Sequence, residues 1–227
     1  MDPLAHKYPN VSPYNFVENN PVILVDPTGL GPEVVINGPD ADKATQELNK
    51  TTSLEVTRDA STGKLLATGE AKTAADKKLL EAIKDKDVTV NLETTNSNSY
   101  VAKDDGKKYD MVIAAYEGST VSTDAAGIKK VNTHQKINMG HTATEEAAGG
   151  NPASLSVLHE IFESYIGGKD DPGGNWNTGY HDAHKKTIAL DPRLIPGSSS
   201  AVNQNTKTGK TDVGVYVDGK FIKLYDK

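Results

Sequence analysis

Runs of apolar residues at regular spacing divide the chain after residue 31 into short elements. Thr73 and Asp76 resemble a capping box, which marks the start of a helix. Three apolar residues at helical spacing follow them, so residues 73–84 are predicted to form a helix. Apolar and polar residues alternate along residues 88–94, which predicts a half-buried strand. Helical and strand periods interleaved in this way predict an α+β fold with a small mixed or antiparallel sheet and packed helices.

Shorter runs predict the remaining elements. A helix is expected at residues 40–49, and strands are expected at residues 54–58, 65–69, 111–116 and 131–139. Near the C-terminus, two strand-like runs flank Asp218-Gly219, which predicts a tight β-hairpin over residues 213–225. Residues 197–209 are rich in Ser, Asn, Thr and Lys, and a loop is expected there.

One predicted helix is apolar over a broad face. Asn151-Pro152 is a strong helix start, and Gly167-Gly168 is an equally good stop. The apolar residues between them fall on one side of the helix: Leu155, Leu158, Ile161, Phe162 and Tyr165. The helix at residues 152–166 is therefore predicted to be buried.

The net charge and the composition of the chain exclude several classes of function. The net charge of −6 and the pI near 5.5 argue against a nucleic-acid binder that relies on a basic face. The absence of cysteine removes disulfides, thiolate metal sites and cysteine nucleophiles. No apolar run approaches the length of a membrane span, and the N-terminus lacks the order of a signal peptide.

The buried helix carries a candidate metal site. His159 and Glu163 are four residues apart, so their side chains lie one turn apart on the same side and can share one divalent ion, for which zinc is the expected choice. Glu160 occupies the position that holds the general base in H-E-x-x-H metallopeptidases. Glu163 replaces the second histidine of that motif, which leaves a structural metal site as an alternative.

A third ligand is expected after the loop at residues 167–179. The segment 180–186 supplies His181 and His184, either of which can reach back to the first pair. Tyr165 and Tyr180 are candidate donors to a developing oxyanion.

Two weaker features raise other possibilities. His134 and His141 suggest a histidine-based nuclease, but no basic patch accompanies them, and they are expected at the surface or in loops. Residues 131–139 are predicted either as a plain sheet strand or as an edge strand that pairs with an extended peptide substrate.

The first thirty residues carry an ordered series of motifs: Asp2-Pro3-Leu4-Ala5, Tyr8-Pro9-Asn10, Ser12-Pro13-Tyr14-Asn15-Phe16-Val17, Asn19-Asn20-Pro21 and Asp26-Pro27-Thr28-Gly29-Leu30. This series resembles the end of the core that closes the shell of RHS-repeat proteins. The resemblance implies that residues 1–31 are a remnant of the shell and that residues 32–227 are its cargo. In that family the cargo is usually a toxin.

The later motifs resemble toxin-associated peptidase-like domains. There, an H-E-x-x-E helix is followed by a Tyr-x-x-Ala-His pattern, which matches Tyr180, Ala183 and His184. The resemblance favours His184 as the third zinc ligand, with His181 second. It implies a secreted or translocated metalloprotease effector for interbacterial competition, which hydrolyses a peptide bond in a target-cell protein and is neutralised by a cognate immunity protein. A toxin nuclease and a non-catalytic, metal-stabilised protein-binding module remain the alternatives.

Overall fold

A computed structural model describes residues 33–102, 105–124, 127–175, 178–191, 193, 199–204 and 210–227 of the chain. The side chains of residue 33 and of residues 199–204 are not among the described atoms. The RHS-like segment and the predicted boundary at residue 31 lie outside the described part, so both stay predictions.

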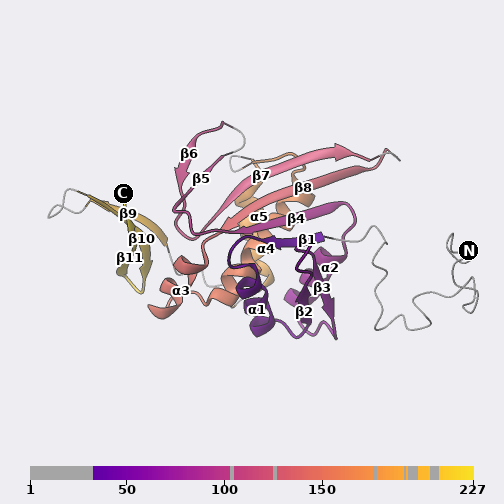
Figure 1. The fold of residues 1–227 in the computed structure, drawn as a ribbon, viewed down its shortest axis with the longest axis horizontal. Coiled ribbons are helices and arrows are strands. Elements are labelled where there is room, and N and C mark those ends of the chain that lie inside the picture. The colour runs from indigo at the N-terminus through magenta and orange to yellow at the C-terminus, as the bar shows by residue number, and fades with distance from the viewer. Residues whose placement is uncertain are drawn as a thin grey trace, which may run out of the picture. The chain divides into compact units, whose positions relative to one another are not determined.

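A four-stranded mixed sheet organises the fold. Its strands are β1 (Glu33–Asn37), β4 (Val88–Thr94), β8 (Lys129–Ile137) and β7 (Ala114–Thr123), in that spatial order. The first three are parallel, and β7 runs antiparallel to β8 at one edge. Figure 1 shows these four strands side by side. The sheet and its helices confirm the predicted α+β class.

Helices cover one face of this sheet. They are α1 (Ala41–Thr51), α2 (Ala74–Lys84), α4 (Ala153–Asp170) and α5 (Tyr180–Leu190), with the shorter α3 (Met139–Ala147) preceding α4. Alternate residues of β4 and β8 point into the core, where they meet α4, and the intervening residues are more exposed. α4 contacts β4, β7, β8 and all four other helices, so it is the central element of the helical layer.

The remaining strands form three smaller sheets. They are the hairpin of β2 (Glu55–Arg58) and β3 (Leu65–Thr68), the hairpin of β5 (Ser99–Val101) and β6 (Lys108–Asp110), and a sheet of β9 (Ser199–Gln204), β10 (Thr211–Val217) and β11 (Lys220–Asp226). The predicted C-terminal hairpin is confirmed as β10 and β11. The predicted loop at residues 197–209 is wrong where β9 lies, because pairing with the free edge of β10 outweighs the weak strand preference of that polar segment.

Helix α3 corrects the expected strand at residues 131–139. The strand ends at Ile137, and the side chain of Asn138 accepts hydrogen bonds from the backbone N–H groups of Gly140 and His141, which caps a new helix. His141, expected at the surface or in a loop, is instead buried in α3 against the ring of Tyr225. The predicted strand at residues 111–116 likewise begins later, at residue 114, and runs to residue 123.

The glycine pair Gly167-Gly168 does not end α4, which continues to Asp170. The reason is close packing between the helix and the sheet. A Cβ atom on Gly168 would lie 2.5 Å from Thr133 Cγ2 and 3.0 Å from Val88 Cγ1. A Cβ atom on Gly167 would lie 3.3 Å from the hydroxyl of Tyr116. The glycines therefore allow α4 to approach the strands rather than terminate the helix.

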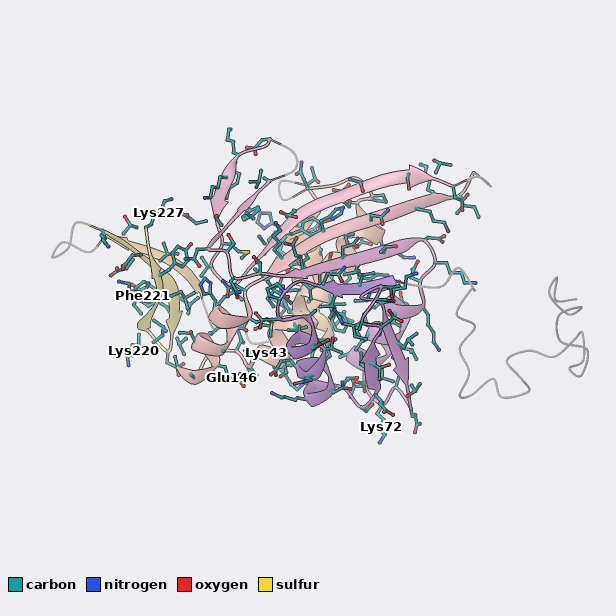
Figure 2. All side chains as sticks on the ribbon, in the orientation of Figure 1. Lys43, Lys72, Glu146, Lys220, Phe221 and Lys227 are labelled. Carbon is teal, nitrogen blue, oxygen red and sulfur yellow. The ribbon has the colours of Figure 1, made fainter. Side chains whose placement is uncertain are left out.

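No helix in the described part of the chain is both long and apolar enough to cross a membrane. Charged side chains extend outward from separate elements. Lys72 and Lys220, labelled in Figure 2, point away from the ribbon and are exposed.

The packing of Gly168 predicts the effect of adding one methyl group. We expect Gly168→Ala to lower the free energy of unfolding by about 1–3 kcal/mol, because overpacking outweighs the better helix propensity of alanine. Urea denaturation measures the loss. Thr133→Ser removes the methyl group that would clash but keeps the hydroxyl that accepts a hydrogen bond from Ser164. Gly168→Ala should therefore cost less in a Thr133→Ser background, and equal losses in the two backgrounds would contradict this explanation.

Candidate metal centre

Two helices bring the candidate ligands together. His159 and Glu163 lie one turn apart on α4, and His184 lies on α5. Small residues face one another where the helices meet, and a Cβ atom on Gly167 would be at ordinary contact distance, 3.7 Å, from the Cβ atom of Ala183. Ala183 is 1 % exposed, which places the next residue, His184, at the boundary between the two helices.

The three ligand atoms form a compact triangle. Nε2 of His159 lies 3.0 Å from Oε2 of Glu163 and 3.1 Å from Nδ1 of His184. The third side, from Nδ1 of His184 to Oε2 of Glu163, measures 3.5 Å. His159, Glu163 and His184 are therefore a group that can hold a metal ion.

The triangle has dimensions that suit a small tetrahedral ion. Nitrogen and oxygen ligands bound to zinc at about 2.0–2.1 Å are about 3.3 Å apart at tetrahedral angles. The three observed separations lie on either side of that value. Oε1 of Glu163 is buried and has no hydrogen-bond partner, which leaves a carboxylate oxygen that an ion can also satisfy.

The charges of this group are strongly linked. Burial favours the protonated form of Glu163, but hydrogen bonds from His159 and His184 outweigh it, and the pKa of Glu163 is lowered. The same bond to Glu163 raises the pKa of His184. The carboxylate of Glu163 is thus held in its ionised form, although its side chain is only 2 % exposed.

Glu160 is buried beside the group, in a different environment. Its carboxylate accepts a hydrogen bond from the amide of Gln135 on β8. Burial, followed by the charge of Glu163, raises the pKa of Glu160 to about 8. The charge of Glu145, a buried residue of α3, adds to this rise. Glu160 therefore keeps its proton near neutral pH in the chain without a metal.

Tyr180 lies against the third ligand. Its ring stacks on the ring of His184, with 5.7 Å between centroids and an interplanar angle of 22°. Burial, the charges of Glu163 and Glu160, and a hydrogen bond to Glu163 all raise the pKa of Tyr180, so its phenol stays protonated. A protonated phenol at this place can donate a hydrogen bond into the site.

The other sequence-predicted residues lie elsewhere. His181 is exposed on α5, next to the ring of Tyr180, and is not part of the group of His159, Glu163 and His184. Tyr165, one of the two candidate donors to an oxyanion, does not donate into the site. Its hydroxyl faces α2, 3.0 Å from Oε1 of Glu81 and 2.7 Å from Oδ2 of Asp85.

β8 is an inner strand of the sheet, between β4 and β7, so it cannot pair with a peptide at a free edge. The edges are β1 and β7. At Ser119 of β7, the backbone N–H already donates to the carbonyl of Gly174 in the loop after α4.

Sequence reasoning missed Gln135 and Glu145. Gln135 occupies an inward position of β8, between Thr133 and Ile137, and is 1 % exposed. A polar residue at a predicted core position was the available signal, because a buried amide needs a polar partner. The role of Glu145 depended on α3, which the sequence pattern did not predict.

Comparisons with models of protein families, with curated proteins and with solved structures each give no match.

The raised pKa of Glu160 makes the stability of the metal-free protein depend on pH. Below the ordinary pKa of 4.5, Glu160 holds its proton in both the folded and the unfolded state, so its contribution to the free energy of unfolding is fully present. Between that value and about 8, only the folded state holds it, so the free energy of unfolding falls as pH rises. With a chelator present, we expect urea unfolding to give a lower value at pH 8 than at pH 5, by a few kcal/mol at most.

Glu160→Gln should remove most of that decrease. His184, whose pKa is raised by its bond to Glu163, would still make stability fall with rising pH, and His141, whose pKa is lowered by burial, would oppose that fall. Glu146→Gln is a suitable control, because Glu146 is an exposed residue of α3, and it should keep the wild-type dependence. A Glu160→Gln protein with the full wild-type decrease would contradict the buried, protonated state.

Proposed function

We propose that residues 32–227 form a zinc-dependent peptidase of the toxin class, which hydrolyses a peptide bond in a target-cell protein. The observation that carries the proposal is the meeting of His159, Glu163 and His184 within 3.5 Å of one another, with Glu160 buried directly beside them. This combines a three-ligand metal group with an acid–base residue.

The donor set favours zinc among the common metal ions. Two imidazole nitrogens and one carboxylate oxygen form one of the known ligand sets of catalytic zinc, and calcium or magnesium would call for mostly oxygen ligands. When bound, zinc polarises a carbonyl group and lowers the pKa of a water molecule. His159, Glu163 and His184 would hold the ion.

Glu160 is the proposed general base and then general acid. It follows His159 directly, and the hydrogen bond from Gln135 fixes its carboxyl group on the inner side of α4. In the chain alone its pKa is about 8, so it would hold a proton at neutral pH. A divalent cation next to Glu160 would favour its ionised form, which is the form that accepts a proton.

Tyr180 is the proposed donor to the oxyanion. Burial, and then the charges of Glu163 and Glu160, raise the pKa of its phenol and keep it protonated, and its ring stacks on that of His184. A hydrogen bond from this phenol would stabilise negative charge that develops on a substrate oxygen.

The ligand count supports a catalytic centre over a structural one. Structural zinc sites usually have four protein ligands, and catalytic sites leave one position open. Among the described residues, the group contains three members, and His181 is not one of them. A position therefore remains for water or substrate.

The motifs in residues 1–30 supply the proposed biological setting. Their resemblance to RHS cores supports delivery from a shell into a competing cell, with a cognate immunity protein for protection. The chain would thus be secreted or translocated, with the shell, the immunity protein and the protein substrate as its partners.

New protein N-termini provide a test that needs no known substrate. Purified, zinc-loaded full chain is incubated with a bacterial lysate, and newly formed N-termini are labelled and identified by mass spectrometry. We expect wild type to generate a reproducible set of cleavages and Glu160→Gln to slow them by about 10²–10⁴-fold, because the base is lost while the ligands stay.

Glu146→Gln is the matched control, since it makes the same chemical change at an exposed position of α3, and it should cleave as wild type does. Equal cleavage by wild type and Glu160→Gln would contradict the proposal. Degradation of nucleic acid by wild type without any proteolysis would also contradict it, in favour of a nuclease.

A further inference from the structure

An open pocket is lined by residues of the three helices α2, α4 and α5. Its volume is about 480 Å³, and small-molecule sites in proteins have volumes of about 300–1,000 Å³. Its apolar lining residues are Ile166, Ala189 and Leu190, and the buried Tyr165 also lines it. We call it the junction pocket. No member of the metal group is among the described residues that line it, so it is a second candidate binding site.

Three lysines line the junction pocket, one from each helix. Lys78 belongs to α2, Lys169 to α4 and Lys186 to α5. Their side chains are 26 %, 44 % and 58 % exposed, so all three are accessible from solvent. Nζ of Lys78 and Nζ of Lys169 lie 5.7 Å and 5.9 Å from the centroid of the Tyr165 ring. Two ammonium groups from different helices are thus held near one aromatic ring of the pocket.

The charges of the lining do not cancel. Glu81 and Asp170 are its two carboxylates. Nζ of Lys78 lies 2.7 Å from Oε2 of Glu81, and Nζ of Lys186 lies 2.7 Å from Oδ2 of Asp170. Lys169 is the third lysine, and its ion-pair partner is not a lining residue. The lining therefore carries one positive charge in excess, which favours a ligand with one negative charge.

Lys169 can donate to such a ligand at little cost to its own partner, Asp85. The side chain of Asp85 is 9 % exposed, and it accepts a 2.8 Å hydrogen bond from Nζ of Lys169. It also accepts hydrogen bonds from the hydroxyl of Tyr165 at 2.7 Å and from the backbone N–H groups of Asp87 and Val88. Asp85 keeps those three bonds if Lys169 turns away, and the ammonium group has three N–H donors in any case.

We propose that the junction pocket binds a small organic acid with one negative charge and an apolar body of one or two rings. The acid group binds the ammonium group of Lys169, because hydrogen bonds between charged groups are the strong ones. The apolar body contacts Ile166, Ala189 and Leu190, which removes apolar surface of both partners from water. This site goes beyond the proposed peptidase function and does not depend on a bound metal.

A pair of fluorescent dyes tests the pocket. The first, 8-anilino-1-naphthalenesulfonate, carries one negative charge on an aromatic framework and becomes fluorescent in apolar surroundings. The second, N-phenyl-1-naphthylamine, has the same framework without the charge. Both are titrated into folded full chain in the presence of a chelator, so the result does not depend on zinc. We expect saturable binding of the sulfonate at one site per chain.

Three single variants locate the site. Lys169→Met should weaken binding of the sulfonate by about tenfold or more and change the affinity for the uncharged dye by about twofold or less, because only a charged hydrogen bond is lost. Lys185→Met is the matched control, since it removes one charge from an exposed position of α5 that does not line the pocket, and it should bind both dyes as wild type does. Ala189→Phe should abolish saturable binding of both dyes, because the added ring fills the pocket from an exposed position.

The sulfonate also binds partly folded proteins, so near-UV circular dichroism must show native packing in every variant. Wild type without saturable binding of the sulfonate would overturn the proposal. Equal weakening by Lys169→Met and Lys185→Met, or unchanged binding to Ala189→Phe, would also overturn it. Because the dyes are titrated without zinc and the variants leave the metal group intact, none of these results bears on the proposed peptidase.

Discussion

The site depends on one buried charge, the carboxylate of Glu163. Its side chain is 2 % exposed, and among the described residues its only ion-pair partners are the imidazoles of His159 and His184. Histidine supplies a full positive charge only when protonated, so neither partner is a permanent cation. A buried carboxylate without a fixed cation is costly, and a divalent ion between the three groups would remove that cost.

The cost of burying a carboxylate also applies to the carboxyl groups next to Glu163. Glu160 and Glu145 are also buried, and burial, then the charges of Glu163 and Glu145, raise the pKa of Glu160. The metal-free chain responds by keeping Glu160 protonated, whereas Glu163 stays ionised next to the histidines. Two carboxyl groups three residues apart on one helix are thereby held in different protonation states. This is the separation that a ligand and a general acid–base residue require.

The sequence predicted the parts of this arrangement that depend on local spacing. The interval of four residues between His159 and Glu163 and the apolar face of α4 follow from helical geometry, and the capping box at Thr73 is present in α2. The choice between His181 and His184 could not be made from spacing, because it depends on the approach of α5 to α4. Gly167 and Ala183 lie at the contact between these two helices.

Other features required knowledge of tertiary packing. Gly167-Gly168 has the composition of a helix stop, but its role is to admit Thr133 and Tyr116 against α4. The role of Gln135 as a hydrogen-bond donor to Glu160 is evident only when the packing of β8 against α4 is known. Tyr100 and Tyr109 pair across a hairpin whose two strands are too short to give a periodic pattern.

Metal content tests the centre most directly. Purified full chain is incubated with zinc, dialysed and analysed by elemental mass spectrometry, with His184→Ala and His181→Ala treated in parallel. The two histidines are three residues apart on the same helix, so each variant is a control for the other. The proposed zinc centre predicts about one zinc ion per chain for wild type and His181→Ala, and a large loss for His184→Ala. Wild type that retains no zinc, or a His184→Ala protein that retains it while His181→Ala does not, would contradict the proposed centre.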